Sequence, residues 1–548
     1  MRKFTLSLLM AATSLVASVQ AQNASGIYWD KDLTVTEQAS DLYRKAPMAM
    51  DEFGNTYVTG THTKDLDFSS SYLQPIATSA FVAKYDYNGK EQWAAGLKGA
   101  ATITSITTDE DGYVYVIGTF ADAVEVLSKD GQSYQTIQGM TDQTDQVSAF
   151  IVKYNKDGYV LAVKTIIPEV TLTDESYWWP EPAFTPKKIQ VIGDRVVLAA
   201  SYKTDCKIDD NLTLKGQYYY NADFGMTGDV ANMGVISLSK ELTDAQLLVK
   251  LGTRETASVN YGPENVNFAA DGNDIYVAFV AWGKDLYLEK ESSALGFNLD
   301  TREDGEQTLY EHAWIVLKAN ERDINTMMMF HSVPTDNEAK FNNIDDMQCK
   351  DGNIYLAGTY NVQFPFSPYR ETYSGNNDSY LVCLSEAKDL EQIWAVRSNY
   401  EDTANKEDEV VTGFAFAGDE IKLCTRIEDM SSHKTNLWRT YTIDSKGQLL
   451  DGEGEMPAAA LAQKYGRVVM QSNNKDTEDA EGTYSFICMD DFATGIANVS
   501  KDATSDNSNA IIYNLDGAQV GKGKASLNSL QKGVYVIKNG NEAKKIIK

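Results

Sequence analysis

The 548-residue sequence predicts an all-β fold: a seven-bladed β-propeller closed by an N-terminal strand, followed by a small C-terminal β module. The first observation behind this prediction is internal repetition, because seven successive units show the same pattern of short strands, with four strands in each of the first six. The second is a glycine turn at the same place in every unit. The third is an isolated strand pattern at the N-terminus, which supplies the strand that the seventh unit lacks.

Two units show the repeat most clearly, at residues 47–99 and 104–166. In each, the order is strand, D-x-x-G or D-G turn, strand, insert, strand, N/D-G turn, strand. Five further units repeat this order with more drift. Glycine suits the first turn because a tight hairpin requires a positive φ. These turn glycines are Gly54, Gly112, Gly193, Gly272, Gly352, Gly418 and Gly466.

An isolated strand pattern, GIYWDKDLTV, occupies residues 26–35. Its Trp29 matches Trp93 and Trp394, which lie in the fourth strands of two complete units. We expect this strand to complete the last blade with residues 457–490, since closure removes the exposed strand edges of an open array. An open β-solenoid or two packed sandwiches are the alternatives that the pattern leaves.

Three units contain sequence pairs that are similar to a known repeat family. The pairs are DEFGNTYVTGTH with SAFVAKYDYNG, DGYVYVIGTF with SAFIVKYNKDG, and DGNIYLAGTY with SYLVCL. They resemble the seven-bladed β-propeller repeat family of bacterial surface proteins. The resemblance is specific in units one, two and five, and it covers residues 26–492 at the level of the fold. It implies an architecture and not an activity.

The N-terminal segment predicts export. Arg2 and Lys3 precede an apolar stretch that is too short to span a bilayer, and Ala21 offers a cleavage site. We therefore divide the chain into a signal peptide at 1–21, a propeller at 22–496, and a linker with a β module at 497–548. No later run reaches the length of a transmembrane helix. The expected location is secreted or on the outer cell surface.

The C-terminal segment follows a polar linker and reads as short strands joined by Asp-Gly and Asn-Gly turns. Its YNLDG (513–517), LQKGVYV (530–536) and closing lysines resemble the C-terminal sorting domain of the type IX secretion system of Bacteroidetes. The resemblance implies that outer-membrane secretion machinery is a partner. A small accessory β module that sorts nothing is the alternative.

The net charge of −29 limits the classes of binding partner that we expect. The two terminal segments, 1–21 and 497–548, carry +2 and +4, so the body between them carries −35. Such a body repels phosphate backbones, and nucleic acid is not an expected partner. A solvated acidic surface that keeps an exported protein soluble is the simplest explanation.

Common catalytic, metal-binding and nucleotide-binding motifs do not occur in the sequence. The four His show no metal-ligand spacing, and the sequence contains no G-x-S-x-G elbow and no P-loop. The five Cys, which stand at least 34 residues apart, are interpreted as buried free thiols. We assign no catalytic residue, no metal and no cofactor.

Aromatic residues are the remaining candidates for binding. Trp178 and Trp179 lie between units two and three, and the insert 203–232 carries Tyr218, Tyr219 and Tyr220. Inserts and inter-blade connections share one face of a propeller, and aromatic rings suit sugars or protein hot spots. The alternative is that aromatic insert residues, such as Phe364 and Phe366, pack the inserts onto the blades.

Together these observations predict an exported, non-catalytic binding or scaffold protein that presents a loop-rich propeller face to a glycan or protein ligand at the cell surface. A polysaccharide-active enzyme, either a hydrolase or a lyase, is one alternative. A structural surface component is the other.

Overall fold

The computed structural model divides into two compact units, Tyr28–Met489 and a second unit of Met1–Ile27 with Asp490–Lys548. The following residues are described by the structure: 27–38, 46–140, 147–169, 183–221, 226–254, 262–290, 293–299, 301–304, 307–321, 323–324, 326–332, 342–361, 364–368, 377–398, 407–429, 434–454, 460–464, 467–473, 481–490, 511–513, 519–522, 534–539 and 542–547.

The larger unit is built from antiparallel sheets that we number in chain order. Sheet 1 contains β2 (Met48–Met50), β3 (Thr56–His62), β6 (Ser79–Tyr85), β7 (Glu91–Lys98), β10 (Ala123–Leu127) and β11 (Ser133–Gln138). Sheet 2 contains β8 (Ala101–Thr108), β9 (Val114–Phe120), β12 (Ser148–Tyr154) and β13 (Val160–Ile166). Sheet 3 contains β15 (Phe184–Ile192), β16 (Arg195–Tyr202), β21 (Asn232–Ser239), β22 (Gln246–Thr253), β25 (Leu286–Lys290) and β26 (Ser293–Phe297).

The next four sheets have four strands each. Sheet 4 contains β23 (Gly262–Asp271), β24 (Asp274–Trp282), β29 (His312–Lys318) and β30 (Met327–His331). Sheet 5 contains β31 (Asn343–Lys350), β32 (Asn353–Tyr360), β33 (Asp378–Ser385) and β34 (Glu391–Arg397), with the short 3-10 helix η2 (Glu386–Lys388) between the last two. Sheet 6 contains β35 (Glu407–Ala417), β36 (Glu420–Asp429), β37 (Lys434–Asp444) and β38 (Leu449–Gly454). Sheet 7 contains β39 (Ala460–Lys464), β40 (Arg467–Asn473), β41 (Gly482–Asp490) and β1 (Ile27–Thr36).

Further short strands form small sheets of two or three strands outside the seven numbered sheets. They are β4 (Leu66–Asp67), β5 (Tyr72–Leu73), β14 (Pro168–Glu169), β17 (Asp205–Lys207), β18 (Thr213–Leu214), β19 (Gln217–Asn221), β20 (Met226–Val230), β27 (Thr301–Asp304) and β28 (Gln307–Tyr310).

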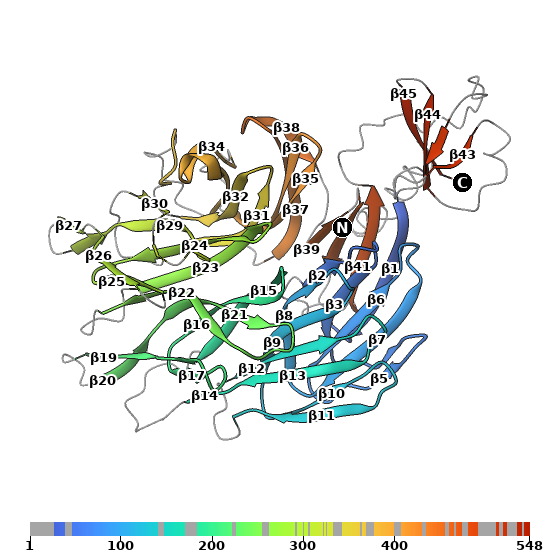
Figure 1. Ribbon diagram of the computed structural model, residues 1–548, viewed down its shortest axis with the longest axis horizontal. Helices are drawn as coiled ribbons and strands as arrows, with labels where there is room; N and C mark the ends of the chain where they lie inside the picture. Colours follow the sequence, from blue (N-terminus) through green and yellow to red (C-terminus); the bar gives the residue numbers. More distant parts are fainter. Residues whose placement is uncertain are drawn as a thin grey trace. The chain divides into compact units, whose positions relative to one another are not determined.

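The numbered sheets form a β-propeller, which is the architecture that the repeats predict (Figure 1). Their innermost strands contact one another in the order β2, β8, β15, β23, β31, β35 and β39, and β39 also contacts β2. Apolar side chains fill the spaces between neighbouring sheets. For example, Val197 of sheet 3 belongs to the same buried cluster as Phe279 of sheet 4.

The number of blade-sized sheets differs from the predicted seven. Among the described residues, eight sheets have four or more strands. The additional one has the order β43-β42-β44-β45 and contains β42 (Ile511–Tyr513), β43 (Gln519–Lys522), β44 (Val534–Asn539) and β45 (Glu542–Ile547). The sequence prediction treated this segment as a minor module, but its β-branched and aromatic runs are long enough to pair as a full four-stranded sheet.

The N-terminal strand β1 is the outer strand of sheet 7, next to β41. The Val35 carbonyl accepts hydrogen bonds from the backbone N–H groups of Thr63 and Lys64, at 2.9 and 3.2 Å, which lie beyond β3 of sheet 1. The buried Arg467 guanidinium lies over the rings of Tyr28 and Tyr87, at 3.5 and 3.1 Å. β1 therefore links the last sheet to the first.

In the first D-x-x-G turn, the aspartate carboxylate accepts the hydrogen bonds that hold the turn in place. Asp51 Oδ1 accepts hydrogen bonds of 2.9 Å from the backbone N–H groups of Phe53 and Asn55, and Tyr57 donates its hydroxyl proton to Oδ2. Gly54 has a φ of 76°, which a residue with a Cβ rarely adopts. The aspartate replaces backbone hydrogen bonds that the turn cannot make, and this explains the recurring sequence pattern.

Two inserts extend neighbouring sheets, which the sequence did not predict. The insert of sheet 2 contributes β10 and β11, which join sheet 1 beyond β7. The insert of sheet 4 contributes β25 and β26, which join sheet 3 beyond β22. Sheets 1 and 3 therefore have six strands instead of four.

Candidate functional site

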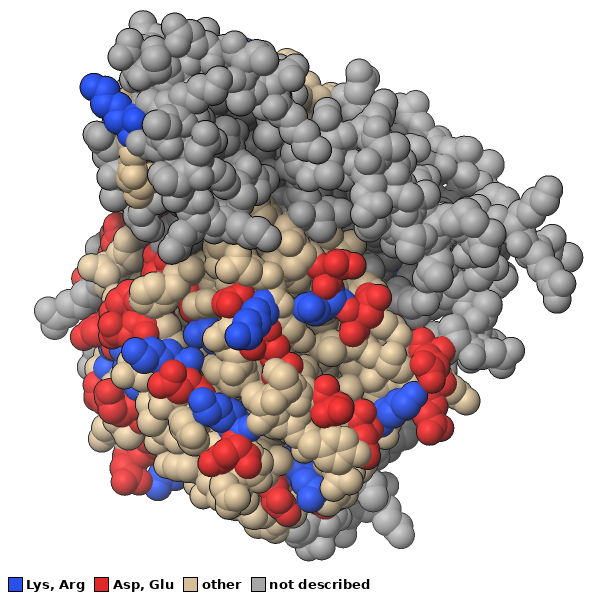
Figure 2. All heavy atoms as spheres, turned by 90° about the vertical axis from the view of Figure 1, so that its right-hand side faces the viewer, with Lys and Arg blue, Asp and Glu red and all other residues tan. Residues whose placement is uncertain are grey.

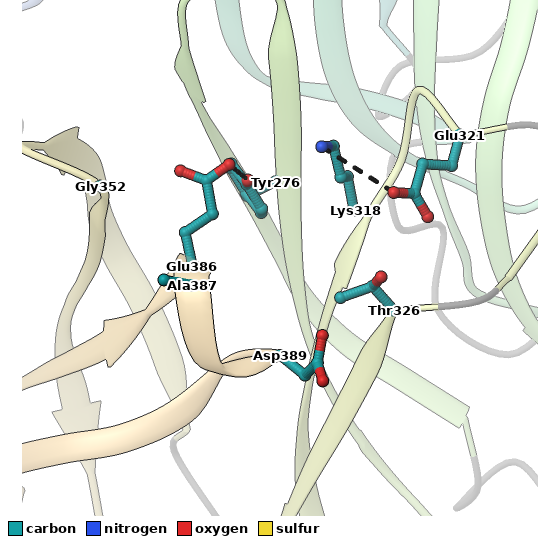
Figure 3. Close-up of a pocket in the computed structure, with 8 residues that line it drawn as sticks. All are labelled: Tyr276, Lys318, Glu321, Thr326, Gly352, Glu386, Ala387 and Asp389. Carbon is teal, nitrogen blue, oxygen red and sulfur yellow. Dashed lines mark hydrogen bonds and ion pairs between the residues drawn. The ribbon is translucent and has the colours of Figure 1, made fainter.

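A polar pocket of about 430 Å³ lies between sheets 4 and 5 (Figure 3). Both sheets contribute through their hairpin turns and through the strand ends beside them. The lining residues are Tyr276, Lys318, Glu321, Thr326, Gly352, Glu386, Ala387 and Asp389. The pocket is therefore at the end of the sheets opposite to the inserts.

Tyr276 and Glu386 connect the two sheets within this pocket. The Tyr276 hydroxyl donates a hydrogen bond to Glu386 Oε1. Burial, together with this hydrogen bond and the nearby negative charge, holds the pKa of Tyr276 well above its usual value. The phenol therefore stays protonated and acts as a hydrogen-bond donor at physiological pH.

Lys318 is the cation of the pocket lining. Its Nζ lies 2.8 Å from Asp274 and 3.8 Å from Glu321, and 5.9 Å from the centre of the Tyr276 ring. The hydrogen bond to Asp274 raises the pKa of Lys318, and the nearby carboxylates raise it further. The ammonium group is thus held in place at the end of β29 and stays charged.

The sheet 5 wall is positioned by backbone contacts around η2. The Glu386 N–H donates to the Gly352 carbonyl at 3.1 Å, and the Leu390 N–H donates to the Ser385 carbonyl at 2.9 Å. Asp389 follows η2 with a φ of 52°. This left-handed turn presents the Asp389 carboxylate to the same pocket as Thr326 of sheet 4 (Figure 3).

A second polar pocket, of about 390 Å³, is formed by the innermost strands of sheets 1, 2, 3 and 7 and their turns. Its charged residues include Glu52, Asp109, Glu110 and Lys464, and Lys464 forms an ion pair with Glu52. The Glu110 carboxylate is paired with Lys240 at 2.8 Å. Charged groups are paired in both pockets, but the lining of the pocket between sheets 4 and 5 also presents a phenol beside a carboxylate, so we take it as the candidate site.

The inter-sheet pocket can exchange hydrogen bonds with a ligand that carries many hydroxyl groups. Carboxylates accept bonds from hydroxyls, while the Lys318 ammonium and the Thr326 hydroxyl donate them. Within the described ranges, no group of three or more His, Cys, Asp or Glu is arranged to bind a metal ion. The five cysteines are free, and burial raises the pKa of Cys206 and Cys424 to about 12.

The sequence-predicted site is only partly visible. Trp178 and Trp179 lie outside the described residues. Tyr218, Tyr219 and Tyr220 belong to β19, which pairs with β20, and the described part of these residues is their backbone. The predicted binding role of these five residues stays a prediction.

Other insert aromatics pack into the core. The side chains of Phe364 and Phe366 are fully buried, and they contact Tyr380 of β33 with ring centres 5.4 and 6.2 Å away. The alternative interpretation, in which insert aromatics pack onto the sheets, therefore applies to this insert.

The residues of the inter-sheet pocket were not singled out from the sequence. Tyr276 lies in the run Ile275-Tyr276-Val277, which indicates only a buried strand. A usable signal exists in the lysine at or next to the end of the third strand of several units, opposite a tyrosine of the second strand. Lys318 occupies the place of Lys84 and Lys153, and each of these three ammonium groups lies over a tyrosine ring of the second strand.

No protein family matches the chain, and no curated protein matches it. Among solved structures, the polysaccharide lyase Uly1 is similar with a TM-score of 0.41 and 7% identity, over 82% of this chain and 90% of the lyase. The periplasmic gluconolactonase PpgL of Pseudomonas aeruginosa has a TM-score of 0.33 and 11% identity, over 75% and 85%. The parainfluenza virus 5 hemagglutinin-neuraminidase ectodomain has a TM-score of 0.30 and 8% identity, over 89% and 96%.

Surface charge and hydropathy add two observations. On the face shown in Figure 2, Lys and Arg stand between more numerous Asp and Glu, without a continuous basic area among the described atoms. No described helix has the length and apolar character needed to cross a bilayer.

Proposed function

We propose that this chain is an exported binding protein that presents a propeller face to a glycan, and that the pocket between sheets 4 and 5 contacts the sugar hydroxyls. The observation that carries the proposal is the meeting of Tyr276, Lys318 and Glu386, from two sheets, around a space of about 430 Å³. A space of this size lies within the range of small-ligand sites.

The chemistry of the lining favours a hydroxyl-rich ligand. Glu321, Glu386 and Asp389 supply acceptor oxygens, and Lys318 and Thr326 supply donors. Three carboxylates and one ammonium group also disfavour an anionic ligand. A neutral glycan satisfies both conditions, because its hydroxyls donate and accept hydrogen bonds without carrying charge.

Export and delivery belong to the same proposal. Residues 1–21 are the signal peptide, and the C-terminal segment directs the protein to the cell surface through outer-membrane secretion machinery. The sequence patterns of these segments support this part of the proposal. Trp178, Trp179 and Tyr218 to Tyr220 are proposed as a further contact region on the insert-bearing face.

A glycan array followed by calorimetric titration of each hit tests the proposal. Lys318→Met keeps the length of the side chain and removes the ammonium group, so we expect affinity to fall roughly tenfold or more. The matched control is Lys64→Met, because the Lys64–Glu481 ion pair is exposed and belongs to another part of the molecule. Equal affinities for both variants, or binding only to protein ligands, would contradict a glycan site in this pocket.

One contact favours a second candidate function, a polysaccharide-active hydrolase or lyase. The protonated Tyr276 phenol is hydrogen-bonded to Glu386, and this pair could exchange protons with a bound sugar. Incubation with a panel of polysaccharides, followed by assays for reducing ends and unsaturated products, tests this function. Activity that Glu386→Gln removes and Glu481→Gln leaves unchanged would establish it, and the absence of products would reject it.

A further inference from the structure

The β10–β11 hairpin is an addition to the propeller framework. It belongs to the chain between β9 and β12 of sheet 2, yet it pairs with β7 and becomes the outer part of sheet 1 (Figure 1). Its inner side contributes Val124, Val126 and Ile137 to the core. Ser133, Tyr134, Gln135 and Thr136 are all exposed, so most of β11 is open to solvent.

Two exposed tyrosines lie in the region where this hairpin meets sheet 2. Tyr134 of β11 is 49% exposed, and Tyr159, which directly precedes β13, is 41% exposed. The Tyr134 hydroxyl donates to the Leu161 carbonyl at 3.1 Å, and Leu161 itself is 45% exposed. We call Tyr134, Tyr159 and Leu161, with the β11 residues beside them, the β11 surface.

The rings of the β11 surface are positioned without being buried. Lys129 Nζ lies 4.9 Å from the centre of the Tyr159 ring, and the Lys129 N–H donates to the Gly158 carbonyl at 2.9 Å. Ser128 Oγ accepts a hydrogen bond of 3.1 Å from the Val160 N–H. These contacts join the hairpin turn to the turn of sheet 2, so both rings are pre-organised on a rigid support.

The polar residues of β11 itself carry no charge, and the Lys129 ammonium group beside this surface lies against the Tyr159 ring. Residues 131–141 read GQSYQTIQGMT, in a chain where 23% of residues are charged. Exposed edge strands are usually protected by lysines or prolines, and β11 has neither. Amide and hydroxyl side chains around two exposed rings instead match a ligand that has apolar faces, many hydroxyls and no net charge.

We propose that the β11 surface binds a neutral polysaccharide chain, with Tyr134 and Tyr159 stacking against sugar rings and the Gln, Ser and Thr side chains of β11 bonding to hydroxyls. β11 has six residues and is about 20 Å long, which provides space for several consecutive sugar units. The body charge of −35 repels an anionic chain from this region. The inference rests on the proposed function as a glycan binder, and its residues are separate from those of the inter-sheet pocket.

The experiment is affinity electrophoresis of the full chain in gels that contain a soluble neutral glucan, with alginate gels as the anionic comparison. We expect retardation in the neutral gel alone, and no loss of it between low and high salt. Tyr134→Ala and Tyr159→Ala should each weaken binding roughly two- to tenfold. The double variant should migrate as it does without polysaccharide.

The matched control is Tyr72→Ala, because Tyr72 is 56% exposed elsewhere on the molecule. This variant should bind normally, and all variants should unfold at the temperature of the unchanged protein within a few degrees. If the double variant binds the neutral glucan as tightly as the unchanged protein, the proposal is wrong. Retardation by alginate alone, or binding of a synthetic strand peptide in place of glucan, would equally overturn it.

A comparison with Lys318→Met separates this inference from the proposed function. Loss of glucan binding in Lys318→Met, with normal binding in the tyrosine double variant, would leave the pocket proposal standing and reject the β11 surface. The reverse pattern would support the β11 surface and reject the pocket. If the unchanged protein binds no neutral glucan, the β11 proposal is wrong, whereas the pocket proposal is rejected only if the glycan array also gives no hit.

Discussion

The indole ring of Trp93 lies against Gly158 of the next sheet, and its Nε1 donates a hydrogen bond of 3.0 Å to the Lys156 carbonyl. A Cβ added to Gly158 would lie 2.6 Å from Trp93 Cδ2, so no other residue fits there without movement. Trp394 has the same relationship to the next sheet, because its Nε1 donates to the Ser445 carbonyl at 3.1 Å beside Gly447. The fourth strand of one sheet is thus attached to the outer turn of the following sheet.

Gly158→Ala should destabilise the protein more than Gly131→Ala. Both glycines have positive φ, at 86° and 73°, so each substitution introduces backbone strain of about 1–2 kcal/mol. At Gly158 the added methyl group also collides with Trp93, whereas at Gly131 it meets no atom within 4 Å. Urea denaturation should show a loss at Gly158 that exceeds the loss at Gly131 by about 1–3 kcal/mol. Equal losses would mean that the indole contact contributes nothing.

Trp29→Ala should open the junction between the last and the first sheet. Trp29 is 7% exposed, lies against Gly89 and stacks on Tyr85 with ring centres 5.8 Å apart. Removal of a buried tryptophan side chain costs about 3–5 kcal/mol of unfolding free energy. Phe53→Ala is the control, because Phe53 is 64% exposed and its loss should change stability little. Thermal unfolding and limited proteolysis measure the difference, and similar behaviour of the two variants would count against a closing role for β1.

Glu409→Gln should be strongly destabilising. The buried Glu409 accepts hydrogen bonds from Arg439 at 3.0 Å, Tyr441 at 2.5 Å and Ser379 at 3.1 Å. The neutral amide would remove the buried negative charge that faces the Arg439 guanidinium, and breaking a buried ion pair costs about 3–5 kcal/mol. Glu481→Gln breaks an exposed ion pair and should cost less than about 1 kcal/mol. Chemical denaturation of the two variants decides the matter, and a small loss for both would refute the prediction.

Acidification should destabilise the fold partly through His62. Burial lowers the pKa of His62 below 6.5, against a smaller opposing effect of its 2.8 Å hydrogen bond to the Lys64 carbonyl. As the pH falls below about 6.5, the unfolded chain takes up a proton that the folded chain does not, so stability decreases by up to about 1.4 kcal/mol per pH unit. His62→Gln should lose less stability than the unchanged protein between pH 7 and pH 5. Parallel curves of unfolding free energy against pH would exclude this contribution.

Truncation after Phe492 should leave the propeller folded. The C-terminal segment belongs to a compact unit different from that of Tyr28–Met489, and the hydrogen bonds of its sheet are formed within residues 511–547. The truncated chain should unfold at the same temperature as the full chain in calorimetry. If the sorting proposal is right, the truncated protein should also accumulate in the periplasm. Normal surface delivery would remove the sorting function, and failure to fold would show that the units depend on each other.

The sequence alone was sufficient for the local architecture of this chain. Strand periodicity and D-x-x-G turns predicted the four-stranded units, because both depend on residues that are near in the sequence. The match of Trp29 with Trp93 and Trp394 correctly indicated an equivalent place, since all three indoles lie against the glycine of an outer turn. The number of sheets of blade size was underestimated because short strands at the C-terminus pair with one another in a way that composition does not reveal.

Only the tertiary structure decided which surfaces the repeats create. β10 and β11 join sheet 1 although they belong to the insert of sheet 2, because strand edges pair with whichever free edge lies close in space. The pocket of Tyr276, Lys318 and Glu386 likewise depends on two sheets that approach each other, and no spacing in the sequence encodes the distance between them. A repeat determines each sheet by local hydrogen bonding and alternation, whereas the sites between sheets arise from the packing of side chains that are far apart in the chain.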